Sequence, residues 1–208
     1  GAANEASIWG TATKAAVSTA AFANGLLAHA LDYDDWEPFA HVGHPSSMIV
    51  GASLPLAENV GASGKDFLKA YVLGLEVICK LAANSANMQE RGFHSTPVYG
   101  SLGATIACAS LLNLDVGKIK AALGIAASAC GGIQRQQGSM VKPFHAGNSA
   151  RNGAEAALLA SAGFTAWSPS SSCTSSAPQA TQTPVDVAFA PLPWTTNAQK
   201  GPRTGIRA

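Results

Sequence analysis

Apolar residues recur at the spacing of an amphipathic helix along most of the first 163 residues, and short polar stretches separate the helical segments. The strongest pattern runs from 65 to 83, where the apolar positions form one wide face. No stretch before residue 164 alternates convincingly in the manner of a strand. The pattern therefore predicts an all-α helical bundle, with helices over about 14–31, 47–57, 65–83, 104–112, 116–129 and 146–162.

Glycine, proline and polar residues mark the expected boundaries of these helices. Residues 32–46, 84–97 and 133–144 are rich in such residues and are predicted to be irregular loops. Pro55 lies inside an apolar segment, where we expect it to kink or shorten the helix. After Thr165 the pattern disappears, because Ser, Thr, Pro and Gln dominate and six of the eleven prolines lie there. We expect this tail to be disordered or irregular.

The overall composition excludes several classes of protein. The formal net charge is +1, which offers no basic surface for nucleic acid. No apolar run approaches the length that spans a bilayer. The four cysteines show no C-x-x-C spacing, and three of them lie in apolar helical patterns, so we expect reduced and buried thiols. With no recognisable signal peptide, these features indicate an intracellular protein, cytoplasmic or mitochondrial.

Candidate chemistry gathers in three polar segments of a chain that is only 12% charged. The first contains Asp32-Tyr33-Asp34-Asp35 with His41 and His44, the second is Gly92-Phe93-His94, and the third runs from Lys142 to Asn148. Each lies next to glycine or proline, where helices usually end. Carboxylates, imidazoles and a lysine at helix ends can perform acid–base chemistry on a small anionic substrate.

These segments, taken in order, resemble the MmgE/PrpD family. The resemblance rests on Ala23–Asp35 with His44-Pro45-Ser46, on Gly92–Thr96, on Leu123–Ala126 and on Lys142–Gly147. It covers roughly residues 6 to 165 and implies the family's large all-helical domain. The family's smaller α+β lid domain, which closes over the active site, is not recognisable in this sequence. We therefore expect a helical domain over 1–165 and a tail over 166–208 that is not family-like.

The resemblance also implies roles for individual residues. Asp32, His44 and His94 match the family's catalytic positions, and Lys142 matches a substrate-binding lysine. The loop before His44 is longer than usual, and its extra His41 is a further candidate for substrate binding. Trp36 stands where decarboxylase-like members often have a small hydroxyl residue. Structural roles remain open for all of these residues, as a loop carboxylate, a capping histidine or a surface lysine.

Two other histidines are assigned structural roles. His29 lies on the apolar stripe of the first predicted helix, so we expect a packed core histidine. His145 lies at a predicted helix start, where we expect it to act as a cap.

The resemblance implies a lyase, either a dehydratase or a decarboxylase, that acts on a small polycarboxylate by metal-free acid–base catalysis without a cofactor. Three alternatives remain open: an isomerase or epimerase, a repurposed biosynthetic enzyme of the same family, and a truncated, non-catalytic dimerisation module. We also expect a homodimer that pairs through the Ala/Gly-rich faces of 98–130.

Overall fold

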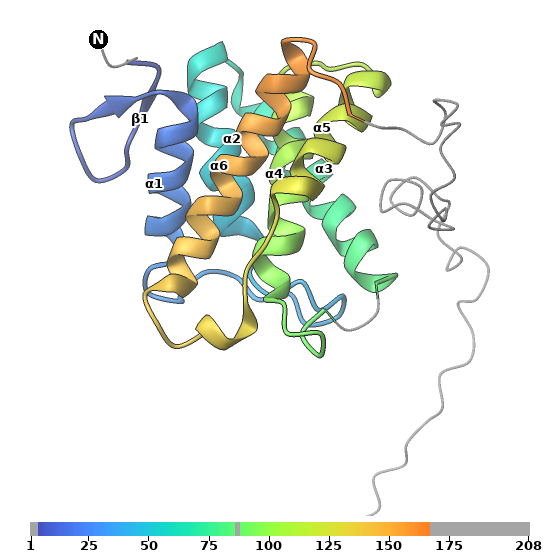
Figure 1. Ribbon diagram of the computed structural model, residues 1–208. Helices are drawn as coiled ribbons and strands as arrows, with labels where there is room; N and C mark the ends of the chain where they lie inside the picture. Colours follow the sequence, from blue (N-terminus) through green and yellow to red (C-terminus); the bar gives the residue numbers. More distant parts are fainter. Residues whose placement is uncertain (1–3, 86–87, 167–208) are drawn as a thin grey trace, which may run out of the picture.

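The computed structural model describes residues 4–85 and 88–166, which form a bundle of six α-helices (Figure 1). The all-α prediction is confirmed for this part of the chain. A hairpin of two-residue strands, β1 and β2, precedes the bundle, so the first helix begins three residues later than expected. The elements in order are β1 (Ala6–Ser7), β2 (Lys14–Ala15), α1 (Val17–His29), α2 (Pro45–Val60), α3 (Gly64–Ala83), α4 (Ser95–Leu111), α5 (Val116–Ala129), the 3₁₀ turn η1 (Gln134–Gln136) and α6 (Val141–Ser161).

Helix α4 is the centre of the bundle. It packs against α2, α3, α5 and α6, and all but one of its residues are buried. Helix α1 lies on the far side of α6 and α2, while α3 and α5 form the outer layer on the other side (Figure 1). Since α4 is covered within one chain, the part of the expected dimer face that it supplies is interior. That location of the interface, over 98–111, is wrong.

Buried Asn24 anchors the N-terminal hairpin to α1. Its side-chain amide donates to the carbonyl of Ser7 at 3.0 Å, and its Oδ1 accepts from the backbone N–H of Trp9 at 2.9 Å. Its amide group is thus hydrogen-bonded on both sides, as a buried polar group requires. The hairpin is fixed further by Glu58 of α2, which accepts from Lys14 at 2.7 Å.

Three helices begin earlier than predicted, and each carries a proline in its first turn. The predicted starts at 47, 104 and 146 become Pro45, Ser95 and Val141. Pro97 and Pro143 are the third residues of α4 and α6. The first-turn N–H groups of a helix have no intrahelical acceptor, so a proline there costs no hydrogen bond. Treating these prolines as helix breakers was therefore the error.

The proline inside α2 does not shorten the helix either. Pro55 is buried, and α2 continues for five residues beyond it to Val60. Leu56 is fully buried and Ala57 nearly so, and their packing outweighs the missing backbone hydrogen bond. The helix ends at Gly61, whose φ of 66° is the left-handed conformation that glycine adopts without strain.

The described cysteines, Cys79, Cys108 and Cys130, are free, but only Cys108 is buried as expected, and the other two are partly exposed. Cys108 is completely buried, and burial raises the pKa of its thiol to about 12. Among the described residues, no helix is both long enough and apolar enough to cross a membrane. The tail predictions concern residues that, after Ala166, lie outside the described part of the chain.

Glycines allow α1, α2 and α6 to approach at backbone contact. A Cβ on Gly51 of α2 would lie 2.7 Å from the Cα of Gly25 in α1, and one on Gly25 would lie 2.8 Å from the Cβ of Ala150 in α6. A Cβ on Gly147 of α6 would lie 2.5 Å from the carbonyl oxygen of Phe22. Neighbouring backbone cannot yield as a flexible side chain can, so these positions fix the spacing of the three helices.

We expect Gly51→Ala to lower the free energy of unfolding by about 1–3 kcal/mol, because the added methyl group must push α1 away from α2. Urea denaturation followed by circular dichroism measures this loss. Gly64→Ala is the matched control, since Gly64 opens α3 with nothing within 4 Å of its Cβ position. Alanine there should stabilise the helix slightly. An equal effect of the two substitutions would contradict the close-packing account.

Candidate active site

One end of the bundle gathers the polar segments singled out in the sequence. The C-terminal end of α1 and the N-terminal ends of α2, α4 and α6 lie together at the lower end in Figure 1, with the long loop between α1 and α2. These helices alternate in direction, which brings the loop after α1 next to the starts of α2 and α6. Residues far apart in sequence therefore meet at this end.

Asp32 is the centre of the cluster. Its Oδ1 accepts from the Nζ of Lys142 at 2.5 Å, across 110 residues of sequence, and lies 3.5 Å from the Nε2 of His44. The side chain of Asp32 is 52% exposed, whereas those of Lys142 and His44 are 18% and 12% exposed. The structure thus brings together three of the five predicted site residues. Asp32 has a φ of 58°, a left-handed conformation that ends the turn after α1.

Two further residues complete this group. Asp34 accepts from the Nδ1 of His29 at 2.8 Å and lies 3.5 Å from the Nδ1 of His44. The two imidazole rings are 4.7 Å apart between centroids. We call Asp32, Asp34, His29, His44 and Lys142 the polar cluster.

Both additional residues were missed as site candidates. His29 was predicted to be a core histidine, and its side chain is indeed completely buried. However, it is buried against carboxylates and His44 rather than in apolar packing. The available signal was position: His29 is the last residue of α1, directly before the Asp32–Asp35 segment.

Hydrogen bonding keeps both carboxylates of the cluster ionised. The hydrogen bond from Lys142 lowers the pKa of Asp32 below its ordinary value of 3.8. Burial alone would raise the pKa of Asp34, but the hydrogen bond from His29 and the His44 ring 3.5 Å away outweigh it and lower that pKa. The cluster therefore presents two fixed negative charges, and one of them is paired directly with an ammonium group.

A pair of buried histidines lies beside the cluster. The Nδ1 atoms of His94 and His145 are 3.1 Å apart, so one ring donates to the other. The prediction that His145 caps a helix is wrong, because it lies inside α6 and is buried. Burial lowers the pKa of His94 to about 3, the charge of Lys142 acts in the same direction, and burial also lowers the pKa of His145. Both histidines are therefore neutral at physiological pH.

The remaining candidate, His41, lies apart. It is exposed in the loop before α2 with a φ of 59°, and within the described ranges no hydrogen bond or ion pair joins it to the polar cluster. Trp36 from the same loop packs edge-on against His44, with centroids 5.0 Å apart. The aromatic ring thus covers one side of the imidazole.

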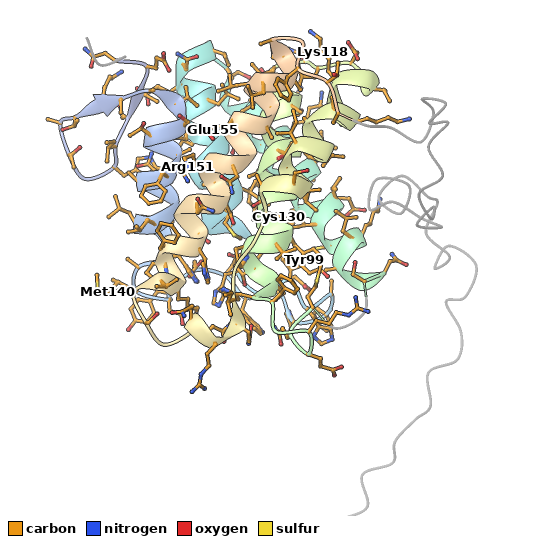
Figure 2. The ribbon with its side chains drawn as sticks, in the orientation of Figure 1. Tyr99, Lys118, Cys130, Met140, Arg151 and Glu155 are labelled. Atoms are coloured by element: carbon orange, nitrogen blue, oxygen red, sulfur yellow. The ribbon has the colours of Figure 1, made fainter. Side chains whose placement is uncertain are left out.

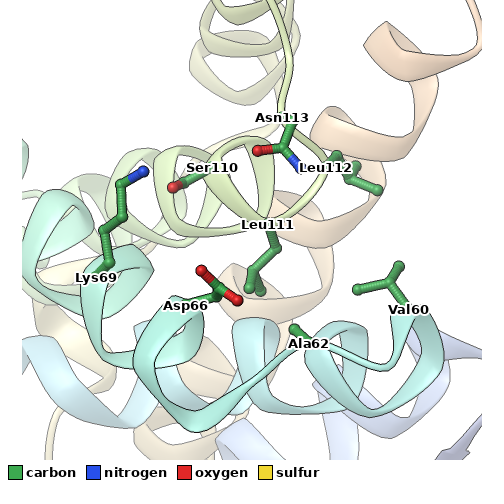
Figure 3. A pocket seen from close by; sticks show the side chains of 8 residues that line it. All are labelled: Val60, Ala62, Asp66, Lys69, Ser110, Leu111, Leu112 and Asn113. Atoms are coloured by element: carbon green, nitrogen blue, oxygen red, sulfur yellow. The ribbon is translucent and has the colours of Figure 1, made fainter.

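A hollow of about 400 Å³ lies at the opposite ends of α2 and α4 (Figure 3). Its lining includes Asp66, whose carboxylate accepts from the Ser63 hydroxyl at 2.6 Å. Ser63 in turn caps α3 by accepting from the backbone N–H of Asp66. This carboxylate therefore belongs to a helix cap, and the hollow contains no residue of the polar cluster.

The family model of the MmgE/PrpD N-terminal domain matches residues 1–176. The chain belongs to the MmgE/PrpD family. Its all-helical fold is the one that the resemblance implied.

Several curated relatives carry the name cis-aconitate decarboxylase. Human cis-aconitate decarboxylase is 38% identical over 152 residues, which is 70% of this chain and 31% of that protein. The cis-aconitate decarboxylase of Aspergillus terreus is 32% identical over 155 residues, 71% of this chain and 31% of its own length. Cis-aconitate decarboxylase-like protein oryM of Aspergillus oryzae is 36% identical over 155 residues, 70% of this chain and 32% of its own. The chain thus spans about a third of the length of these relatives.

The buried neutral histidines predict loss of stability in mild acid. His94 has an ordinary pKa of 6.5 when unfolded and about 3 when folded. Below 6.5 the unfolded chain therefore binds a proton that the folded chain does not, so the unfolding free energy falls as pH falls through this window. The slope for one histidine is at most about 1.4 kcal/mol per pH unit.

Denaturant unfolding at several pH values between about 7 and 5, above the range in which carboxylates titrate, measures this slope. We expect His94→Gln to flatten the slope. His41→Gln is the matched control, because that histidine is exposed and should leave the slope unchanged. An unaltered slope in His94→Gln would show that acid sensitivity arises elsewhere.

Proposed function

We propose that this chain forms the helical part of a lyase that decarboxylates or dehydrates a small polycarboxylate by metal-free acid–base catalysis. The observation that carries the proposal is the contact of Asp32, His44 and Lys142, which come from segments up to 110 residues apart. The relatives named cis-aconitate decarboxylase make cis-aconitate the first substrate to test. An isomerase or a non-catalytic module remains a possible outcome of the same assay.

In this proposal Lys142 binds a substrate carboxylate. Its ammonium group is the cation of the cluster, and it already holds one carboxylate, that of Asp32, at 2.5 Å. An incoming carboxylate would replace or share that partner. The exposed His41 would contact a more distant carboxylate from the loop.

His44 is the proposed proton donor and acceptor. In a decarboxylation, the bond between the carboxylate and its carbon breaks, CO₂ leaves, and the remaining electron pair takes a proton from the imidazolium form of His44, which becomes a neutral imidazole. In a dehydration, the same imidazole removes a carbon-bound proton or protonates the departing hydroxyl group. Asp32, 3.5 Å from the Nε2 of His44, stabilises the imidazolium that forms when this ring accepts a proton. His94, hydrogen-bonded to His145, is proposed to orient the substrate or to relay a proton.

The assay follows cis-aconitate and 2-methylcitrate by proton NMR with the purified chain, alongside calorimetric binding of each acid. We expect Lys142→Ala to raise KM and weaken binding, because it removes the carboxylate anchor. His44→Ala should lower kcat by about 10²–10⁴-fold and leave binding nearly intact.

Lys118→Ala is the control for loss of a lysine at the other end of the bundle (Figure 2), where its Nζ donates to the carbonyl of Ser161. It should leave KM and kcat unchanged. Binding of neither acid, or binding that Lys142→Ala leaves unaltered, would contradict the proposal and favour a non-catalytic module.

We also propose that the chain self-associates through its outer helices. Helix α3 packs on α4 with one face, and the opposite face exposes Leu68 and Val72 at 61% and 59%. These residues are four positions apart and form an apolar stripe on the outer surface. A second copy of the chain that covers this stripe would explain why apolar side chains lie on the outer face of α3. The free cysteines of the described region support an intracellular location.

Replacing Leu68 with glutamate should convert a dimer into a monomer, because the interface would then bury an unpaired charge. Light scattering at micromolar concentration measures the mass. Leu159→Glu, which changes an exposed leucine of α6 off this stripe, is the control and should leave the mass unchanged. A monomer before any substitution would refute the proposed association.

A further inference from the structure

One buried nitrogen of the polar cluster has no role in the proposed reaction. The Nε2 of His29 is buried and, within the part of the chain that the structure describes, has no hydrogen-bond partner, and the same holds for the Nδ1 of His44. The side chain of His29 is completely buried, and its Nε2 faces the Oδ1 of Asp32 at 3.9 Å. Buried polar atoms are nearly always satisfied, so such an orphan needs an explanation.

The other ring nitrogen of His29 is held in the manner of a metal ligand. Its Nδ1 is hydrogen-bonded to the Asp34 carboxylate at 2.8 Å. Histidines that ligate metals almost always donate their second N–H to a carboxylate or carbonyl, which leaves the first nitrogen as a lone-pair donor. His44 has the same two carboxylates as neighbours but is held less closely, with its Nδ1 3.5 Å from Asp34 without a hydrogen bond and its Nε2 3.5 Å from Asp32.

The spacing of the donor atoms fits a small dication. Ligands about 2.0–2.1 Å from a tetrahedral zinc ion lie about 3.3 Å from one another. The Nε2 atoms of His29 and His44 lie 3.9 and 3.5 Å from the Oδ1 of Asp32, both close to that spacing. One donor atom from each of His29, Asp32, Asp34 and His44 lies within 4.8 Å of the others.

We propose that this cluster binds a divalent transition-metal ion such as Zn²⁺ through the Nε2 atoms of His29 and His44 and the Oδ1 of Asp32. Asp34 positions the imidazole of His29 through its Nδ1 atom and lies 3.5 Å from the Nδ1 of His44. Two imidazoles favour zinc and its neighbours in the first transition series over magnesium or calcium, which prefer oxygen ligands. The fourth coordination position is left for water or a ligand.

Zinc and Lys142 compete for the same oxygen. The ammonium group occupies the Oδ1 of Asp32 in the structure, and a dication placed there would repel it. Zinc binding therefore displaces Lys142 and occupies the space in front of His44. If the cluster performs the proposed reaction, zinc inhibits it. This inhibition, unlike zinc binding itself, rests on the proposed function.

The test measures Zn²⁺ affinity by competition with a chromophoric chelator on the full 208-residue chain, after treatment with EDTA and without substrate. We expect one ion per chain. Asp32→Asn and His44→Gln should weaken binding at least about tenfold, since each removes a ligand. Lys142→Gln should tighten binding several-fold because it removes the competing cation. His41→Gln, which removes an exposed histidine of the same loop, should leave the affinity unchanged.

The decisive pair is Asp32→Asn and Lys142→Gln. Both side chains are partly exposed, so neither substitution threatens the core, and their opposite effects are not expected of general damage. Equal affinity in the two variants would overturn the proposal, as would loss of binding in His41→Gln. Cobalt provides a second measurement: an intense near-ultraviolet thiolate band would assign the ion to a cysteine and also overturn it.

The result is separable from the proposed catalysis. Zinc binding is measured with no substrate present, so an inactive chain that binds zinc as described still supports the metal site. An active chain whose turnover is unaffected at saturating zinc would refute the competition between the ion and Lys142.

Discussion

The close approach of α1, α2 and α6 at glycine positions is the constraint on which the candidate site depends. Gly25 and Gly51 bring the backbones of α1 and α2 together, and Ala150 closes the contact from α6. His29 lies one turn beyond Gly25 at the end of α1, and His44 and Lys142 lie at the starts of α2 and α6. A wider spacing of these helices would separate the segments that meet at Asp32. The small residues of this chain therefore determine both its packing and the geometry of its polar cluster.

The sequence predicted the number and class of the helices but not where three of them begin. Hydrophobic periodicity identifies α3 clearly, because only one face of this helix packs against the bundle and that face is apolar. It carries little information in α4, which is buried on all sides and begins with Ser95-Thr96-Pro97. A proline starts a helix when the irregular segment precedes it and ends one when the irregular segment follows it. Here the loops that carry site residues precede the prolines, so the prolines mark helix starts next to the site.

Most site residues in polar segments were predicted from the sequence, whereas the site histidines within helices were not. Asp32, His44 and Lys142 were found because they lie in polar segments of a charge-poor chain, and the family motifs named the same residues. His29 and His145 lie inside helices, where a lone histidine is usually a packing residue, and only the folded chain shows that each faces another ionisable group. Asp34 was one of four acidic residues in a single loop. Its selection requires the loop conformation, which turns its nearly buried carboxylate toward the Nδ1 atoms of both His29 and His44.

The exposure of Asp32 determines how strongly it holds its partners. Ion pairs at the protein surface contribute little to stability, since water screens the charges and solvates them when they separate. Asp32 is about half exposed, so its contact with Lys142 is strong enough to orient the ammonium group and weak enough to be exchanged. Asp34 is the opposite case, because its side chain is only 9% exposed and it is fixed between two histidines. The cluster thus combines a rigid carboxylate that sets the direction of both imidazoles with an exchangeable one. Lys142 must release Asp32 when it accepts a substrate carboxylate or when a metal ion takes its place. This exchange requires a weakly held Asp32 next to a firmly held Asp34.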